Sequence, residues 1–108
     1  MLPRKFKIGN KARIEYIIKK GRRINGKFFQ LRGLPSRMPH LRFSVIVSGK
    51  ISKKAVERNF IRRRIYEAIH TGVLSPKCYD IVVLVSRKII DADWDEIKEE
   101  TARGLQQL

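Results

Sequence analysis

The stretch KKAVERNFIRRRIYEAI, residues 53–69, combines the periodicity of a helix with a run of three arginines. At about 100° per residue, its branched apolar residues fall within one sector, which is expected to pack on a core. These residues are Ile61, Ile65, Ala68 and Ile69. The opposite sector is polar and cationic, and it comprises Asn59, Arg62, Arg63 and Tyr66, with Arg58 at its edge. Val56 and Phe60 belong to neither group, and the periodicity assigns them no role.

The polar sector of this helix is expected to bind a polyanion. The two carboxylates of the helix, Glu57 and Glu67, lie outside it. A guanidinium group stays charged and donates paired hydrogen bonds, which suits phosphate oxygens. Three more cations precede the helix, where Ser52 is a candidate N-cap: Lys50, Lys53 and Lys54. A merely solvated charged face is the alternative, but clustering of one sign favours binding.

The segments on either side of the helix predict a βαβ unit. LRFSVIVS, residues 41–48, and YDIVVLVS, residues 79–86, are nearly continuous in apolar and β-branched residues, as buried strands are. Upstream, the pattern predicts a helix over 11–20, capped by Asn10 and stopped at Gly21, then a basic connection and a strand over 27–34.

The chain ends in a further predicted helix, in which Asp93 is the N-cap and Glu96 completes a capping box. Trp94, Ile97 and Leu105 are its expected inward residues. The order α-β-β-α-β-α predicts an α+β fold, an α/β sandwich with helices on a small sheet, as a single domain over residues 1–108.

Charge is the strongest signal in the composition. The 108 residues include 25 Lys and Arg against 10 Asp and Glu, a net charge of +15. Residues 91–108 hold six acidic and two basic residues, so residues 1–90 carry +19. Such self-repulsion indicates a polyanionic partner, first a nucleic acid and second an anionic membrane surface.

The remaining composition indicates a cytoplasmic protein. No apolar run approaches the roughly 20 residues of a membrane-spanning helix, and the first residues lack the apolar region of a signal peptide. Cys78 is the single cysteine, expected as a buried thiol in a reducing compartment.

The segment SGKISKKAVERNFIRRRIYEAI, residues 48–69, resembles the signature of the protein subunit of bacterial ribonuclease P. The matching residues are Ser48, Lys50, Ala55, Val56, Arg58, Asn59, Ile61, Arg62, Arg63 and Glu67. The similarity extends to the N-terminal region, to YDIVVLVSRK and to WDEIKEETARGLQQL. The resemblance therefore covers nearly the whole chain. Phe60 and Tyr66 stand where the family usually has arginine, and Arg64 where it mostly has an apolar residue.

The resemblance implies a ribonucleoprotein endonuclease that removes the 5′ leader from precursor tRNA. Its RNA subunit would carry out the Mg²⁺-dependent hydrolysis, and the protein would bind that RNA through the basic helix. The implied contacts to the RNA subunit are Lys50, Lys53, Lys54, Arg58, Asn59, Arg62, Arg63 and Tyr66. The leader would lie in a cleft between the first helix and the sheet, at Ile14, Ile18, Phe29 and Leu31. The family also implies a left-handed βαβ crossover, against the usual handedness.

The residues themselves predict no catalytic site and no bound metal in this chain. His40 and His70 form no recognisable acid–base pair, and Cys78 has no partner ligand for zinc. The acidic run at residues 91–96 suits a helix N-terminus better than a calcium loop, whose glycine it lacks. A non-enzymatic RNA-binding protein, such as a ribosomal component, is the alternative function, and a basic DNA-binding module is the third.

Overall fold

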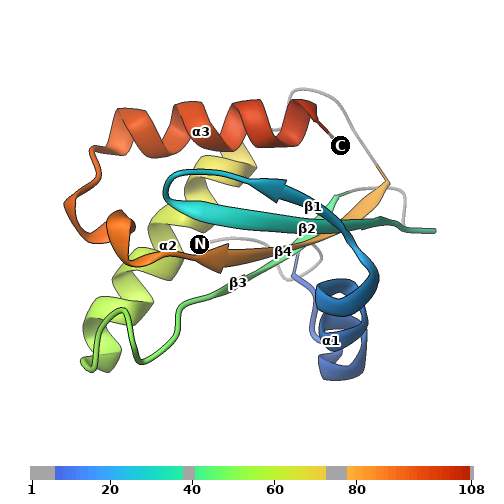
Figure 1. Cartoon of the computed structure of the whole chain (residues 1–108), viewed down its shortest axis with the longest axis horizontal. Helices are drawn as coiled ribbons and strands as arrows, with labels where there is room; N and C mark the ends of the chain where they lie inside the picture. Colours follow the sequence, from blue (N-terminus) through green and yellow to red (C-terminus); the bar gives the residue numbers. More distant parts are fainter. Residues whose placement is uncertain (1–6, 38–40, 73–77, 108) are drawn as a thin grey trace.

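One four-stranded sheet organises the molecule, with spatial strand order β1-β2-β4-β3. The computed structural model describes residues 7–37, 41–72 and 78–107. Helices α2 and α3 cover one face of the sheet and α1 lies on the other (Figure 1). The elements are α1 (Lys11–Lys20), β1 (Arg22–Asn25), β2 (Phe29–Pro35), β3 (Arg42–Ile46), α2 (Ala55–Gly72), β4 (Tyr79–Val85), the 3₁₀ helix η2 (Arg87–Asp91) and α3 (Trp94–Gln106). The predicted α+β sandwich is confirmed.

The βαβ unit is present as predicted. β3 and β4 pair in parallel, with Val45 opposite Val83, and α2 connects them. β4 lies between β3 and β2, to which it runs antiparallel. This central position explains its continuous apolar run, since Ile81, Val82 and Val83 are all fully buried although they point to alternate faces.

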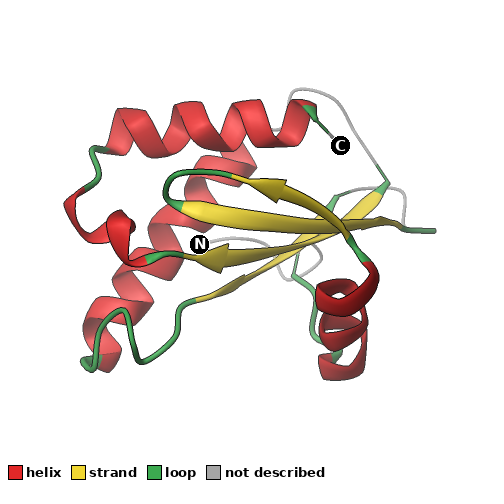
Figure 2. Cartoon of the chain, in the orientation of Figure 1, coloured by secondary structure: helices red, strands yellow, loops and turns green. Residues whose placement is uncertain are grey.

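The predicted order lacked one strand. Residues Arg22–Asn25 form β1 and not a connection, so the order is α-β-β-β-α-β-α (Figure 2). β1 is four residues long and only Ile24 among them is buried, which leaves too little alternation for a strand to be recognised. The hairpin to β2 turns tightly at Gly26, where a Cβ atom would lie 2.8 Å from the Glu100 carboxyl carbon.

The helix starts were predicted with mixed success. Asn10 caps α1 as expected, its side-chain oxygen accepting the Arg13 N–H at 3.1 Å. α2 begins at Ala55, three residues after Ser52, whose hydroxyl oxygen accepts the Lys54 N–H at 3.3 Å instead of capping the first turn. Asp93 occupies the N-cap position of α3, but its side chain makes no capping bond, so the predicted capping box is wrong.

Side-chain alternation along the strands creates two apolar clusters, one on each face. The larger cluster lies under α2 and α3, and it includes Phe29, Leu31 and the inward residues of α2. Ile97 of α3 is buried there, with Trp94 and Leu105 packed against its edge as predicted. The smaller cluster lies under α1 and centres on Ile17 and Val82.

The sequence analysis also singled out Cys78, membrane spans and two histidines. Cys78 is exposed and not buried, because it precedes the buried run of β4. Within the described ranges, no helix is long and apolar enough to cross a membrane. His40 lies outside the described residues, as does the side chain of His70.

Candidate nucleic-acid interface

The face of α2 that points away from the sheet carries amide and guanidinium groups. The predicted inward residues are all buried, with Ile65 fully so. Asn59 and Arg63 are exposed and Arg62 is half-buried. One Arg62 nitrogen donates to the Asn59 side-chain oxygen at 2.6 Å, which orients both groups on the outer surface. Arg58 bends back and donates to the Ser52 carbonyl at 2.8 Å, so it braces the segment before the helix.

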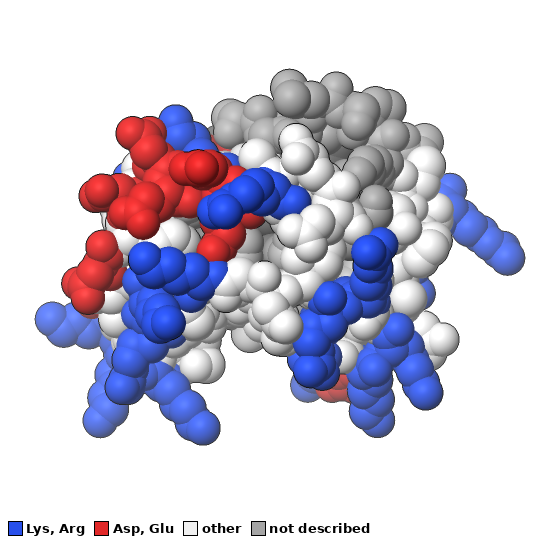
Figure 3. Space-filling view, turned by 45° about the horizontal axis from the view of Figure 1, so that its top comes forward, with Lys and Arg blue, Asp and Glu red and all other residues white. Residues whose placement is uncertain are grey.

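Most of the described carboxylates lie away from this face, although exposed Glu67 lies one helical turn from Arg63. In the view of Figure 3, most Lys and Arg side chains project over the start of α2 and over α1, while most acidic side chains gather beside α3 with a few basic side chains next to them. Asp80 pairs with Arg13 and Arg42, Glu96 pairs with Lys27 and Asp95 pairs with Lys98, so none of these three carboxylates uses an arginine of α2. The α2 guanidinium groups therefore keep their charge available for an external anion.

The lysines before α2 extend the same surface. Lys50, Lys53 and Lys54 are all exposed, as the sequence predicted. The carbonyl of Lys50 accepts a hydrogen bond from Arg87 at 3.0 Å, which ties the loop before α2 to the start of η2. This loop therefore presents its ammonium groups from a backbone that is held in place.

Tyr66 does not belong to the outer surface. Its ring packs against Phe43, with ring centroids 5.3 Å apart, and Lys7 lies over it at 5.4 Å. Its hydroxyl oxygen accepts the backbone N–H of Val45 at 3.4 Å. β3 is an edge strand, so this contact satisfies a donor that the sheet leaves unpaired. The predicted outward position of Tyr66 is wrong because the side chain is long enough to reach the sheet edge.

A second surface lies where α1 meets the sheet. Ile14 and Ile18 of α1 are half-buried there, packed on the cluster that contains Val82. The half-buried side chains of Ile46 and Leu84 belong to the same cluster, in register on β3 and β4. This face carries a partly exposed apolar strip beside α1, as a cleft for a single strand would require.

Phe29 and Leu31 are not part of that strip. Each is 2% exposed and belongs to the cluster under α2 and α3, on the opposite face of the sheet from Ile14 and Ile18. The expectation that they line the cleft beside α1 is therefore wrong. Their neighbours on β2 point the other way because successive residues of a strand alternate between faces.

Gln30 and Arg32 are the β2 residues that the alternation places on the α1 side, and the sequence prediction of the cleft missed them. Arg32 donates to the Ile18 carbonyl and, at 2.8 Å, to the Gln30 side chain. Gln30 in turn donates to Asn25 of β1 at 2.6 Å. The signal that could have found them is the parity of β2, because buried Phe29 and Leu31 oblige Gln30 and Arg32 to face α1.

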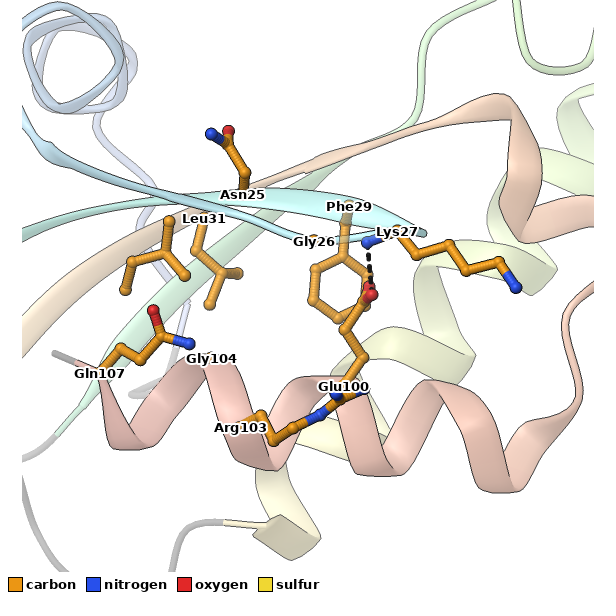
Figure 4. Close-up of a pocket in the computed structure, with 10 residues that line it drawn as sticks. Asn25, Gly26, Lys27, Phe29, Leu31, Glu100, Arg103, Gly104 and Gln107 are labelled. Atoms are coloured by element: carbon orange, nitrogen blue, oxygen red, sulfur yellow. Dashed lines mark hydrogen bonds between the residues drawn. The ribbon is translucent and has the colours of Figure 1, made fainter.

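A pocket of about 470 Å³ opens between the β1–β2 hairpin and α3 (Figure 4). Its apolar wall includes Phe29 and Leu31, and Arg103 lies at its rim. The buried carboxylate of Glu100 reaches across from α3 and accepts the backbone N–H groups of Lys27 and Phe28, the latter at 2.8 Å. Glu100 thereby fixes the hairpin to α3, which makes it a structural anchor of this side of the molecule.

In the part of the chain that the structure describes, no group of three or more His, Cys, Asp or Glu side chains comes together as a metal site. The chemistry that these surfaces offer is charge, hydrogen bonding and apolar contact.

Comparison with known proteins identifies the family. The family model described as Ribonuclease P matches residues 2–108. The chain belongs to the ribonuclease P protein family. The ribonuclease P protein component of Synechococcus sp. is 34% identical over 79 residues, 63% of this chain and 62% of that protein. That of Thermus brockianus is 33% identical over 88 residues, 82% of this chain and 51% of that protein. These matches span less than two thirds of either relative's own length.

The ribonuclease P family also shares the fold. The structure of the Staphylococcus aureus RNase P protein superposes with a TM-score of 0.83 at 25% identity, covering 94% of each chain. The resemblance seen in residues 48–69 is thus confirmed at the level of family and fold.

Proposed function

We propose that the chain is the protein subunit of a cytoplasmic ribonuclease P, which removes the 5′ leader from precursor tRNA. The observation that carries the proposal is the outer face of α2 in a chain of this family. Arg62 and Arg63 project there, and Asp80, Asp95 and Glu96 form their ion pairs with other residues. Guanidinium groups arranged in this way match the phosphates of a folded RNA.

In this proposal the chain binds and positions, while the RNA subunit holds the Mg²⁺ and cleaves. Asn59, Arg62, Arg63 and the lysines before α2 dock the RNA subunit. The strip beside α1, with Ile14, Ile18 and the Arg32 side of β2, guides the single-stranded leader. The two surfaces lie on different faces of the sheet, so one rigid domain can hold both RNAs at a fixed separation.

Reconstitution tests the function. The chain is added to the cognate RNA subunit, 5′-labelled precursor tRNA and Mg²⁺ over a range of salt concentrations. We expect no cleavage by the chain alone, and at low salt a clear stimulation of leader release by the RNA subunit. Failure to stimulate the RNA subunit at every ionic strength would contradict the proposal.

A further inference from the structure

Two apolar side chains of α2 face solvent beside its arginines. Val56 is 82% exposed and Phe60 is 57% exposed, one helical turn further along. Side chains one turn apart lie next to each other on a helix surface, so the two form one small apolar strip. Packing gives no reason for this strip, since the inward sector of α2 is complete without it.

Arg64 holds the Phe60 ring in a defined place. Its guanidinium lies 5.3 Å from the centre of the Phe60 ring and 4.9 Å from the centre of the Trp94 ring. Trp94 packs against the core, so the stack links the Phe60 ring to α3. A ring held in this way loses little conformational entropy when a ligand stacks on it.

We propose that Val56 and Phe60 form a platform on which one unpaired nucleobase of the RNA subunit stacks, with Arg63 and Arg64 beside it for the adjoining phosphate. The proposal deepens the proposed function and rests on it. A base within a duplex has both faces covered by its neighbours, so the platform selects a base in a loop or bulge.

The surroundings favour RNA over a protein as the occupant. Two side chains supply far less apolar area than the core of a stable protein–protein interface. Exposed Asn59 and Arg63 flank the strip, and both belong to the face proposed to dock the RNA subunit. An aromatic ring next to guanidinium groups is the combination that binds unpaired bases while holding their backbone.

The test compares Phe60→Leu with Phe60→Tyr in the full chain bound to the intact RNA subunit. Both variants keep a large side chain with apolar carbon atoms, and only tyrosine keeps an aromatic ring. We expect Phe60→Leu to weaken binding about fivefold or more and Phe60→Tyr to stay within about twofold. The log–log salt slope should not change in either, because no phosphate contact is lost. Ile90→Ala, at a 47% exposed apolar residue of η2, is the matched control and should bind as the unmodified chain does.

Photo-cross-linking locates the base. A benzophenone amino acid at position 60 should react with a nucleotide that chemical probing shows to be unpaired, and the same group at position 90 should not. Phe60→Leu binding as tightly as the unmodified chain, or a cross-link to a base-paired nucleotide, would overturn the platform alone. If the unmodified chain did not bind the RNA subunit, the proposed function itself would fail. The two failures are therefore distinguishable.

Discussion

The buried carboxylate of Asp80 accepts two hydrogen bonds from the guanidinium of Arg42, at 2.8 and 2.7 Å. Arg13 of α1 adds a third bond at 3.0 Å. Burial, the largest single effect, works to raise the pKa of Asp80, but the hydrogen bonds and positive charges of Arg42 and Arg13 together outweigh it and hold the pKa below its usual value. Asp80 thus joins α1, β3 and β4 through one ionised group.

The lowered pKa predicts a pH-dependent stability. The contribution of such a carboxylate is complete above its unfolded pKa of about 4, and it is lost as the pH falls from there through the folded pKa. We expect Asp80→Asn to lower the free energy of unfolding at pH 7 by about 3–5 kcal/mol, as for a buried pair that loses one partner. Between pH 5 and pH 3, the free energy of unfolding of Asp80→Asn should also fall less than that of the unmodified chain. Urea unfolding at fixed ionic strength measures both.

Asp95→Asn is the control for this prediction. Asp95 is 94% exposed and lies 3.6 Å from Lys98, so its neutralisation should leave the unfolding midpoint nearly unchanged at pH 7. If Asp80→Asn retained the full acid sensitivity of the unmodified chain, another carboxylate would be responsible for it.

Glu100 provides a second test of the fold. Its carboxylate accepts both hairpin N–H groups, of Lys27 and Phe28. Glu100→Gln keeps the size but turns an amide donor toward one of them, so we expect a loss of about 1–3 kcal/mol in the free energy of unfolding. Glu99→Gln, at the exposed neighbour, should change it by less than about 0.5 kcal/mol. If thermal unfolding showed the same loss of stability in both variants, Glu100 would not anchor the hairpin.

The elements that the sequence predicted correctly are the ones with a long periodic pattern of apolar residues. The strands around Val45 and Val83, and the inward stripe of α2, follow from apolar spacing alone because burial imposes that spacing. β1 escaped prediction because Ile24 is its single buried residue, and its pairing with β2 depends on tertiary contacts.

The site was less predictable because the orientation of a side chain depends on its neighbours in space. Helical angles alone placed Tyr66 outward, yet its hydroxyl reaches Val45 at the edge of the sheet. The face to which Phe29 points is fixed by the helices that pack on each side of β2, and a single strand does not reveal them. The glutamate at position 100 likewise gives no sequence sign of its hairpin partners, 72 and 73 residues away.

Because Phe29 lies in the core and not beside α1, truncation of Phe29 and truncation of Ile18 should affect RNA binding differently. Phe29→Ala removes a core ring, so we expect about 3–5 kcal/mol lower stability and an equal loss of binding to precursor and leaderless tRNA. Ile18→Ala removes contact area beside α1, so it should weaken precursor binding about fivefold more than binding of leaderless tRNA. The ratio of the two dissociation constants, measured with the holoenzyme, cancels any change in the folded fraction. A changed ratio for Phe29→Ala alone would place the leader on the other face.

The outer face of α2 is tested by its salt dependence. Arg62→Ala combined with Arg63→Ala should weaken binding to the RNA subunit and make the log–log salt slope shallower by about 1.4–1.8 units, at about 0.7–0.9 unit per lost phosphate contact. Arg62 bonds only to the exposed side chain of Asn59 among the described contacts, so folding should change little.

The matched control for this pair is Lys98→Ala combined with Arg103→Ala, which removes the same two charges from α3. Its slope should match that of the unmodified chain, because the acidic side chains gather on that side of the molecule (Figure 3). Equal slopes for both pairs would mean that net charge alone drives binding. A shallower slope for the α3 pair only would move the RNA interface from α2 to α3.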